Sequence, residues 1–199
     1  HDIIATIEPH DSVERYTGLG VDVVKGYATI IDPWTVEIKR EDGEIQRLTT
    51  RSIVIATGGR PFVPDLPGLD DVGYVTSDTL WEEFAQMADI PKRMIVLGGG
   101  PIGCELSQAF ARLGAKVVQV ERADRLLARE DAEVAELALS AQQRSGVEVL
   151  TSHDAIRCEL VDGEKRLILS VDGKEKSIAF DALIIAVGRS ARLTGFGLE

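Results

Sequence analysis

The stretch MIVLGGGPIGCELSQAFARLGAKVVQVE, residues 94–121, changes from a strand pattern to a helix pattern and back again. Its first four residues form a continuous apolar run, which is typical of a buried strand. Apolar residues then recur at helical spacing from Ile102 to Leu113, and Gly114 follows where helices commonly end in glycine. AKVVQVE is a second strand pattern. The stretch therefore predicts a β-strand, an α-helix and a second, parallel β-strand.

Three glycines stand between the first strand and the helix in the spacing G-x-G-x-x-G. In this context the spacing is typical of dinucleotide binding: the first glycine makes the tight turn, the second admits a pyrophosphate, and the third lets the helix approach the strand. The helix N-terminus then attracts phosphate through free N–H groups and a partial positive charge. We assign five residues of this turn to cofactor binding: Gly98, Gly100, Pro101, Ile102 and Gly103.

Two acidic residues complete the predicted cofactor site. Glu121 ends the second strand, 18 residues after Gly103, where the fold expects an acid to bind the adenosine ribose hydroxyls. A carboxylate there repels a 2′-phosphate, so we expect NAD(H) in preference to NADP(H). Arg122 leaves NADP(H) open, because a guanidinium group binds phosphate well, and the alternative for Glu121 is a solvated strand end. Glu105, early in the helix, is either stabilised by the helix dipole alone or faces the nicotinamide.

The chain before this stretch has the pattern of short antiparallel strands. Its apolar and β-branched runs are separated by Lys-Gly, Asp-Pro and Asp-Gly turns and occupy residues 21–24, 27–32, 35–38 and 45–56. The last of these runs ends in IVIA, residues 53–56, which is continuously apolar, as expected for a strand covered on both faces. Three prolines between residues 61 and 68 exclude a helix or a central strand, so we place a boundary there.

Two further helices are predicted in the nucleotide-binding region. A short helix with Ser77 or Asp78 as its N-cap precedes the glycine loop. A longer helix at residues 131–146 follows the second strand and leads into a third strand at residues 147–150. We expect the longer helix to bury one apolar face, formed by Val134, Leu137, Ala138 and Ala141.

The region ends in a second meander and a buried strand. Asp-Gly pairs at 162–163 and 172–173 are hairpin signals between three strand patterns. The run ALIIAVGRSA, residues 182–191, is similar to SIVIATGGRP, residues 52–61, and both place a glycine after the apolar run, Gly188 and Gly58. We interpret the two runs as a pair that brackets the nucleotide-binding region. The alternative is two unrelated buried strands.

Composition narrows the class of function. At 199 residues, 44% of them hydrophobic, the chain fits one large or two small globular domains. A net charge of -11 opposes binding to nucleic acid or anionic lipid, so we expect neither as a partner. No apolar run is long enough to span a bilayer, and HDIIATIEP lacks the features of a signal peptide. We therefore expect a cytoplasmic protein.

Neither the cysteines nor the histidines suggest a catalytic or metal site. Cys104 and Cys158 are too far apart in sequence for a CxxC-type redox or metal motif, and we expect both to be small buried hydrophobes. His1, His10 and His153 stand alone in polar surroundings, where a surface or hydrogen-bonded histidine is the expected state. We therefore assign no catalytic residue and no metal ligand.

Four motifs, in order, resemble the pyridine nucleotide-disulfide oxidoreductases: IVIATGGRPFVPDLPG, GGGPIGCELSQAFARLG, VVQVERADRLLARED and LIIAVGR. This is the FAD-dependent family of dihydrolipoamide dehydrogenase, glutathione reductase and mercuric reductase. DSVERYTGLGVDVVKGYA resembles the mercuric reductase-like branch most. The resemblance implies an α/β fold, a Rossmann-like NAD(P)-binding domain with a β-meander flanked by partial FAD-domain segments.

The resemblance also implies residue roles. Thr57, Gly58 and Gly59 match the segment that touches the flavin nucleotide, and Gly188 marks the return to the FAD domain. Ala28 matches a position near the FAD adenine. Glu105 matches a glutamate beside the nicotinamide carboxamide. The family's usual continuation after Gly-Arg is absent, because Ser190, Ala191 and Arg192 follow Arg189.

The same family places its first dinucleotide motif and its redox disulfide before this segment, and its dimerisation domain after it. We therefore expect a partial FAD-binding domain at residues 1–63, an NAD(P)-binding domain at 64–187 and a return to the FAD domain at 188–199. In the full-length homodimeric enzyme, NAD(P)H would deliver hydride to FAD and on to the disulfide. The alternatives are a stand-alone NAD-binding module and an NADH oxidase or ferredoxin reductase-like flavoenzyme, and the terminal electron acceptor stays open.

Overall fold

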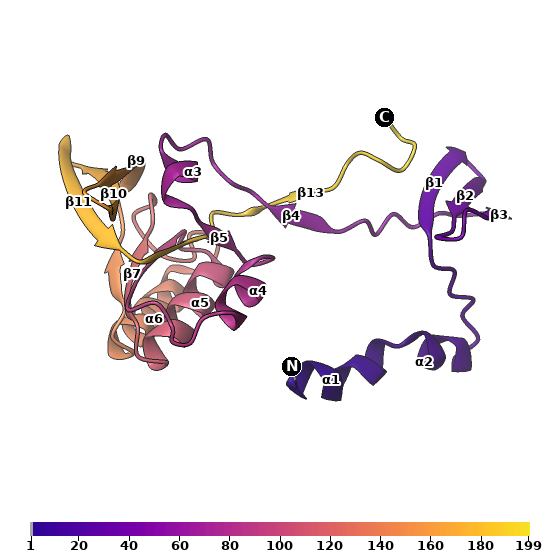
Figure 1. The fold of residues 1–199 in the computed structure, drawn as a ribbon, viewed down its shortest axis with the longest axis horizontal. Coiled ribbons are helices and arrows are strands. Elements are labelled where there is room, and N and C mark those ends of the chain that lie inside the picture. The colour runs from indigo at the N-terminus through magenta and orange to yellow at the C-terminus, as the bar shows by residue number, and fades with distance from the viewer. Residues whose placement is uncertain (1) are drawn as a thin grey trace. The chain divides into compact units, whose positions relative to one another are not determined.

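The strand that leads into the glycine loop is the central strand of a five-stranded sheet in the computed structural model, which describes residues 2–199 (Figure 1). All neighbouring strands are parallel. Residues 94–97 and 183–185 are buried, as expected for strands covered on both faces. The predicted α/β fold is confirmed. The strand order is β5 (Val75–Thr76), β12 (Ala182–Ile185), β6 (Arg93–Leu97), β7 (Lys116–Val120) and β8 (Glu148–Leu150).

The chain forms two compact units. The second unit, residues 59–191, contains the parallel sheet and the glycine loop. The first unit combines residues 2–58 with residues 192–199, so the end of the chain returns to its beginning. The assignment of these parts to flavin and nucleotide domains stays a prediction.

Helix α5 (Pro101–Arg112) forms as predicted and connects β6 to β7. Gly114 has φ +103°, which favours glycine after a helix. Helix α4 (Leu80–Ala85) begins later than expected: its N-cap is Thr79, not Ser77 or Asp78, and Asp78 instead pairs with Arg189. A further short helix, α3 (Leu69–Val72), was not predicted.

The apolar face predicted for the longer helix is wrong at its two large residues. In α6 (Ala132–Arg144), Val134 and Leu137 are 48% and 70% exposed, whereas Ala135 and Gln142 are buried. The helix packs through a small side chain and a glutamine whose Nε2 donates to the Cys104 carbonyl at 2.7 Å. Of the predicted face, Ala138 and Ala141 are half-buried beside these two residues, so the hydrophobic pattern was drawn toward the exposed side by the two large side chains.

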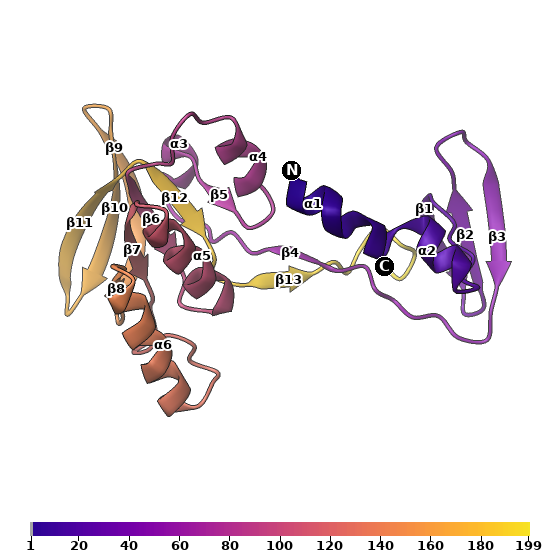
Figure 2. The same ribbon diagram turned by 90° about the horizontal axis from the view of Figure 1, so that it is seen from below.

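Alternate residues of the central strand face two different cores. Met94 and Val96 pack with Leu106 and Phe110 of α5, and Ile95 faces the opposite cluster. That cluster includes residues of a second, antiparallel sheet: β9 (Asp154–Val161), β10 (Glu164–Val171) and β11 (Lys174–Phe180). Figures 1 and 2 show α4 (Leu80–Ala85), α5 and α6 on one side of the parallel sheet, and β9–β11 with the short helix α3 on the other.

The turns of this meander have the predicted chemistry. Asp162 and Gly163 have φ values of 51° and 80°, and Asp172 and Gly173 have 50° and 72°. Two consecutive positive φ values define the type I′ hairpin turn, which Asp-Gly favours.

At the edge of the meander, Arg93 of β6 binds Asp181 and Glu164 at 2.7 and 2.9 Å. Hydrogen bonds from Arg93 hold the pKa of both carboxyl groups below their ordinary values.

The two similar apolar runs, residues 52–61 and 182–191, differ in structure. Residues 182–185 form β12, whereas residues 53–56 form no strand, and Val54 is 89% exposed. Residues 21–24 also form no strand. These strand predictions are wrong, because no neighbouring strand within residues 2–199 pairs with either segment. The residues that follow the two runs do pair, as antiparallel β4 (Gly59–Pro61) and β13 (Arg189–Ala191).

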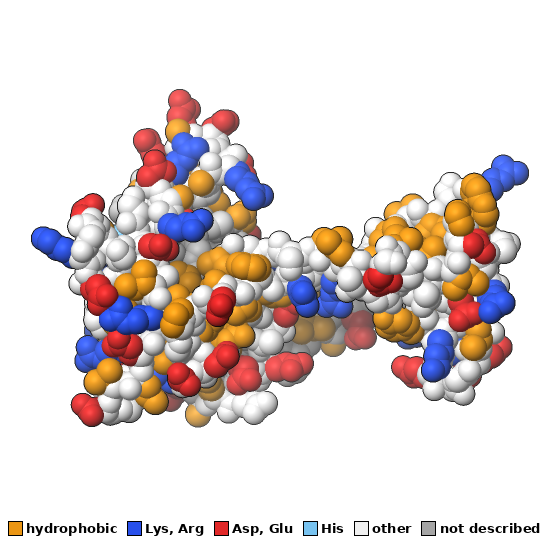
Figure 3. All heavy atoms as spheres, turned by 90° about the horizontal axis from the view of Figure 1, so that it is seen from above, with side chains coloured by type: hydrophobic (Ala, Val, Ile, Leu, Met, Phe, Trp, Pro, Cys, Tyr) orange, Lys and Arg blue, Asp and Glu red, His pale blue; other side chains and the backbone are white. Residues whose placement is uncertain are grey.

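The first unit contains little core. Its strands β1 (Tyr27–Asp32), β2 (Thr35–Lys39) and β3 (Ile45–Thr49) form an antiparallel sheet, and Ile30 N–H donates to the Phe196 carbonyl at 2.7 Å. Ile38 is the one buried hydrophobic side chain among residues 3–58 and 192–199. Figure 3 shows hydrophobic side chains on the surface of this unit, at the right. Its helical elements are α1 (Asp2–Ile7), η1 (Glu8–Asp11) and α2 (Val13–Gly18).

Substitution of two leucines separates the core from the misassigned helix face. Leu183 of β12 is 1% exposed, so Leu183→Ala should lower the free energy of unfolding by about 2–5 kcal/mol. Leu137→Ala, on the exposed side of α6, should change it by no more than about 0.5 kcal/mol. Urea unfolding followed by circular dichroism measures both. An equal loss in the two variants would contradict the observed helix orientation.

Candidate dinucleotide-binding site

The first and third glycines of the loop are required by close approach within the protein. Gly98 follows β6 with φ +122°, and a Cβ there would lie 2.3 Å from the Ala186 carbonyl oxygen. A Cβ on Gly103 would lie 2.2 Å from the Gly98 carbonyl oxygen. Any side chain at either position would therefore push the turn away from the strand or the helix.

The middle glycine differs. Gly100 is the N-cap of α5 with φ -77°, a value that any residue adopts. A Cβ at this position would meet no neighbouring part of the described protein within 4 Å. Packing does not explain this glycine, and the space in front of it is open for a ligand to approach the backbone.

The start of α5 presents free amide donors beside this open space. Gly98 N–H donates to the Val120 carbonyl at 2.8 Å, and Gly99 N–H donates to Glu121 Oε2 at 2.5 Å. The amides of Gly100, Ile102 and Gly103 have no acceptor among residues 2–199, and Pro101 has no N–H. Three free donors at the positive end of a helix form an anion site, which suits a pyrophosphate.

Glu121 is held by the backbone. Besides Gly99 N–H, its carboxylate accepts from Ala123 N–H at 2.6 Å. The side chain is half-buried and lies at the end of β7, next to the loop, as the sequence predicted. Arg122 is exposed and forms no ion pair with any residue the structure describes. Glu105 is exposed on α5, and its side chain likewise forms no hydrogen bond or ion pair within the described chain.

Two residues of the loop after β7 also hold the glycines, and the sequence analysis missed them. Leu127 N–H donates to the Gly99 carbonyl at 2.8 Å, from a left-handed backbone with φ +49°. Leu126 is 1% exposed, and a Cβ on Gly99 would lie 2.9 Å from its Cδ2. The available signal was a pair of leucines in an otherwise charged run. A left-handed non-glycine residue leaves no mark in sequence.

The residues matched to flavin contacts are divided between the two units. Gly59 and Gly188 lie in the second unit, where Phe62 N–H donates to the Gly188 carbonyl at 2.9 Å and Arg189 Nη2 to the Gly59 carbonyl at 2.9 Å. Thr57 and Gly58 lie in the first unit and bond to Arg192.

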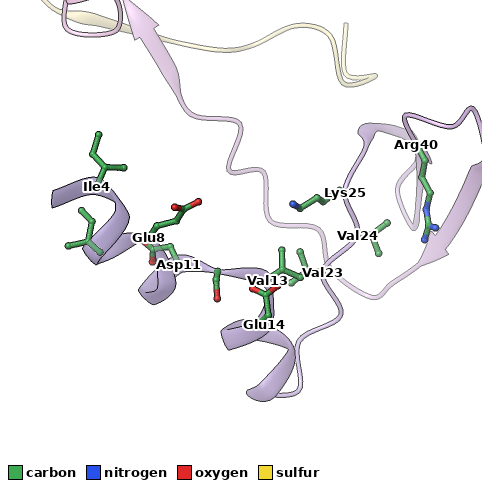
Figure 4. A pocket seen from close by; sticks show the side chains of 11 residues that line it. Ile4, Glu8, Asp11, Val13, Glu14, Val23, Val24, Lys25 and Arg40 are labelled. Carbon is green, nitrogen blue, oxygen red and sulfur yellow. The ribbon is translucent and has the colours of Figure 1, made fainter. Parts of the chain in front are cut away.

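Ala28 pairs with Ile38 in the sheet of the first unit. A hollow in that unit is lined by other residues, among them Glu8, Lys25 and Arg40 (Figure 4).

Cysteine and histidine contribute no reactive group to the site. Burial raises the pKa of the Cys104 thiol and raises that of Cys158 to about 11. His153 Nδ1 lies 2.6 Å from the Thr151 carbonyl oxygen, and His1 lies outside the described residues. Within residues 2–199 no cluster of three metal-binding side chains occurs. No helix in that range has the length and apolar character needed to cross a membrane.

The parallel sheet, the glycine loop at its central strand and the acid at the end of β7 define an α/β protein with a Rossmann-like fold. The pyridine nucleotide-disulphide oxidoreductase family matches residues 4–199, and the chain belongs to this family.

Named relatives agree with this assignment. The chain is 31% identical over 199 residues to a mercuric reductase of Bacillus cereus and 35% identical over 209 aligned positions to a dihydrolipoyl dehydrogenase of Pseudomonas aeruginosa. Both alignments cover the whole chain but only 30% and 43% of those proteins. The HOCl-induced flavoprotein disulfide reductase RclA from Escherichia coli superposes with a TM-score of 0.70 at 26% identity, over 92% of this chain and 40% of RclA.

Alanine at two of the glycines should separate packing from ligand space. Gly103→Ala places a Cβ against the Gly98 carbonyl and should destabilise the second unit by about 1–3 kcal/mol. Gly100→Ala meets no such contact and should leave stability unchanged or slightly raised. Thermal unfolding measures both variants. A larger loss for Gly100→Ala would contradict the described loop.

Proposed function

We propose that this chain binds a nicotinamide dinucleotide at the glycine loop, with its pyrophosphate on the start of α5. The observation that carries the proposal is the set of three free amides beside Gly100, whose Cβ direction is open. An anion bound there needs no basic side chain, which suits a chain of net charge -11. Membership of the family supports a pyridine nucleotide as the ligand.

Within a full-length protein we propose that the chain is the nucleotide-binding part of a homodimeric flavoprotein disulfide oxidoreductase. The named relatives support this, and each is more than twice as long as the matched segment. There NAD(P)H would supply hydride to FAD and on to a redox disulfide. This chain contributes the binding and orientation of the nicotinamide dinucleotide. A Cys-x4-Cys pair in the same reading frame, and flavin reduction by NADH in its product, test this proposal.

We favour NAD(H) over NADP(H) because Glu121 cannot easily turn away. Two backbone N–H groups hold its carboxylate at the end of β7, at 2.5 and 2.6 Å. A 2′-phosphate on the adenosine ribose would meet a fixed negative charge, whereas ribose hydroxyls would donate to it. Arg122 beside it is exposed, and its guanidinium group is the feature of this region that would favour a 2′-phosphate.

The binding site is tested by filling the space in front of Gly100. Gly100→Trp should abolish saturable NADH binding, measured by calorimetry or nucleotide fluorescence, because the indole occupies the approach to the free amides. Gly18→Trp is the matched control: Gly18 is also open within 4 Å, lies in the first unit and should leave binding unchanged. Equal binding by native chain and Gly100→Trp would refute the site.

Neutralising Glu121 tests the choice of cofactor. Glu121→Gln removes the negative charge and one of the two backbone contacts, so NADH should bind about tenfold more weakly and the penalty against NADPH should shrink. Glu130→Gln, an exposed change in the same loop, controls for net charge. The ratio of the two dissociation constants is the measured quantity. An unchanged ratio would show that Glu121 does not select the cofactor.

A further inference from the structure

Gln119 of β7 is a glutamine in the core of the second unit. Its side chain is 0% exposed and lies between the strand and the start of α5. Nε2 donates to the Gly98 carbonyl at 3.1 Å and lies 3.6 Å from Cys104 Sγ. The neighbours on either side along the strand, Val118 and Val120, are apolar. A buried amide therefore reaches the glycine loop from beneath.

Stability does not explain this residue. Gln119 Oε1 is buried and has no hydrogen-bond partner anywhere in the described chain. An orphaned buried oxygen costs at least as much as one amide hydrogen bond adds, so an apolar side chain of the same size would serve the core as well. The contact with the glycine loop is what distinguishes glutamine from methionine or leucine at this position.

Gln119 and Glu121 hold the two ends of one peptide group. The Gly98 carbonyl and the Gly99 N–H belong to the same peptide plane; the first accepts from Gln119 and the second donates to Glu121. Gln119 lies in β7 and Glu121 directly follows it, so the two side chains, two positions apart, extend from the same face. Glycine on each side allows this plane many orientations, and the pair of contacts selects one.

We infer that Gln119 is a positioning residue for the dinucleotide site. The inference rests on the proposed function and concerns the ligand-free loop. By fixing the Gly98–Gly99 peptide, Gln119 orients the chain that leads into the free amides of Gly100 and Ile102 before the pyrophosphate arrives. A loop that is already ordered loses less conformational entropy on binding, and so binds more tightly.

The test compares two buried glutamines that differ in what they hold. Gln119→Met keeps the side-chain volume and removes the contact to Gly98. Gln142→Met is the matched control, because Gln142 is 4% exposed, has an unpartnered Oε1 and donates to the Cys104 carbonyl inside α5. We expect Gln119→Met to raise the dissociation constant of NADH about three- to tenfold and Gln142→Met to leave it unchanged.

A second readout needs no ligand. In the ¹⁵N-labelled chain, the amides of Gly99 and Gly100 should shift and exchange with solvent faster in Gln119→Met than in the native protein or Gln142→Met. If Gln119→Met does not fold, Gln119→Asn keeps the amide but draws it back by one methylene, and the same results are expected.

Native-like affinity together with native-like Gly99 and Gly100 amides would overturn the inference, as would a loss of thermal stability in Gln119→Met that exceeds the Gln142→Met loss and accounts for the weaker binding. If the native chain does not bind NADH, the proposed function fails. The amide exchange then still decides whether Gln119 orders the loop.

Discussion

The second unit depends on the close approach between the glycine turn and the first turn of α5. A Cβ at Gly103 would lie 2.2 Å from the Gly98 carbonyl oxygen, so strand, turn and helix meet only where side chains are absent. This approach puts the N-terminus of α5 at the end of the central strand. It also leaves the first amides of the helix without partners, because the turn runs on into the helix with no capping side chain. The glycine packing that closes the turn therefore also leaves these helix amides free.

The surroundings of the turn satisfy every polar group of Gly98 and Gly99 and none of the three amides beyond them. The acceptors and donors come from β7 and the loop that follows it: Val120, Glu121, Gln119 and Leu127. Glu121 thus has two consequences, since the carboxylate that orders the loop also presents a fixed negative charge where the ribose is expected. Under the proposed function, the side chain that selects the cofactor is also the one that orders the loop.

Sequence patterns predicted those parts of the second unit whose conformation is determined by residues close together in the chain. The β-α-β stretch follows from apolar spacing, and the two Asp-Gly turns follow from their left-handed backbone. The patterns failed where residues distant in sequence determine which side chains are buried or bonded. Val134 and Leu137 of α6 are apolar yet exposed, because the helix docks through Ala135 and Gln142. The contacts of Gln119 and Leu127 depend on residues about 20 to 30 positions away, which no local period records.

The first unit shows the limit of apolar pattern as a predictor. Residues 53–56 have the composition of a doubly covered strand, as do residues 183–185, but only the second run lies between two parallel neighbours. A run of residues becomes a central strand only when strands pair on both of its edges. Its apolar composition shows that it is suited to burial but does not supply those neighbours. Val54 is the clearest case: it is 89% exposed, whereas a fully buried valine contributes about 1.5–3 kcal/mol to the free energy of folding. The parallel neighbours of β12 belong to the second unit itself, so the core of that unit closes without residues 53–56.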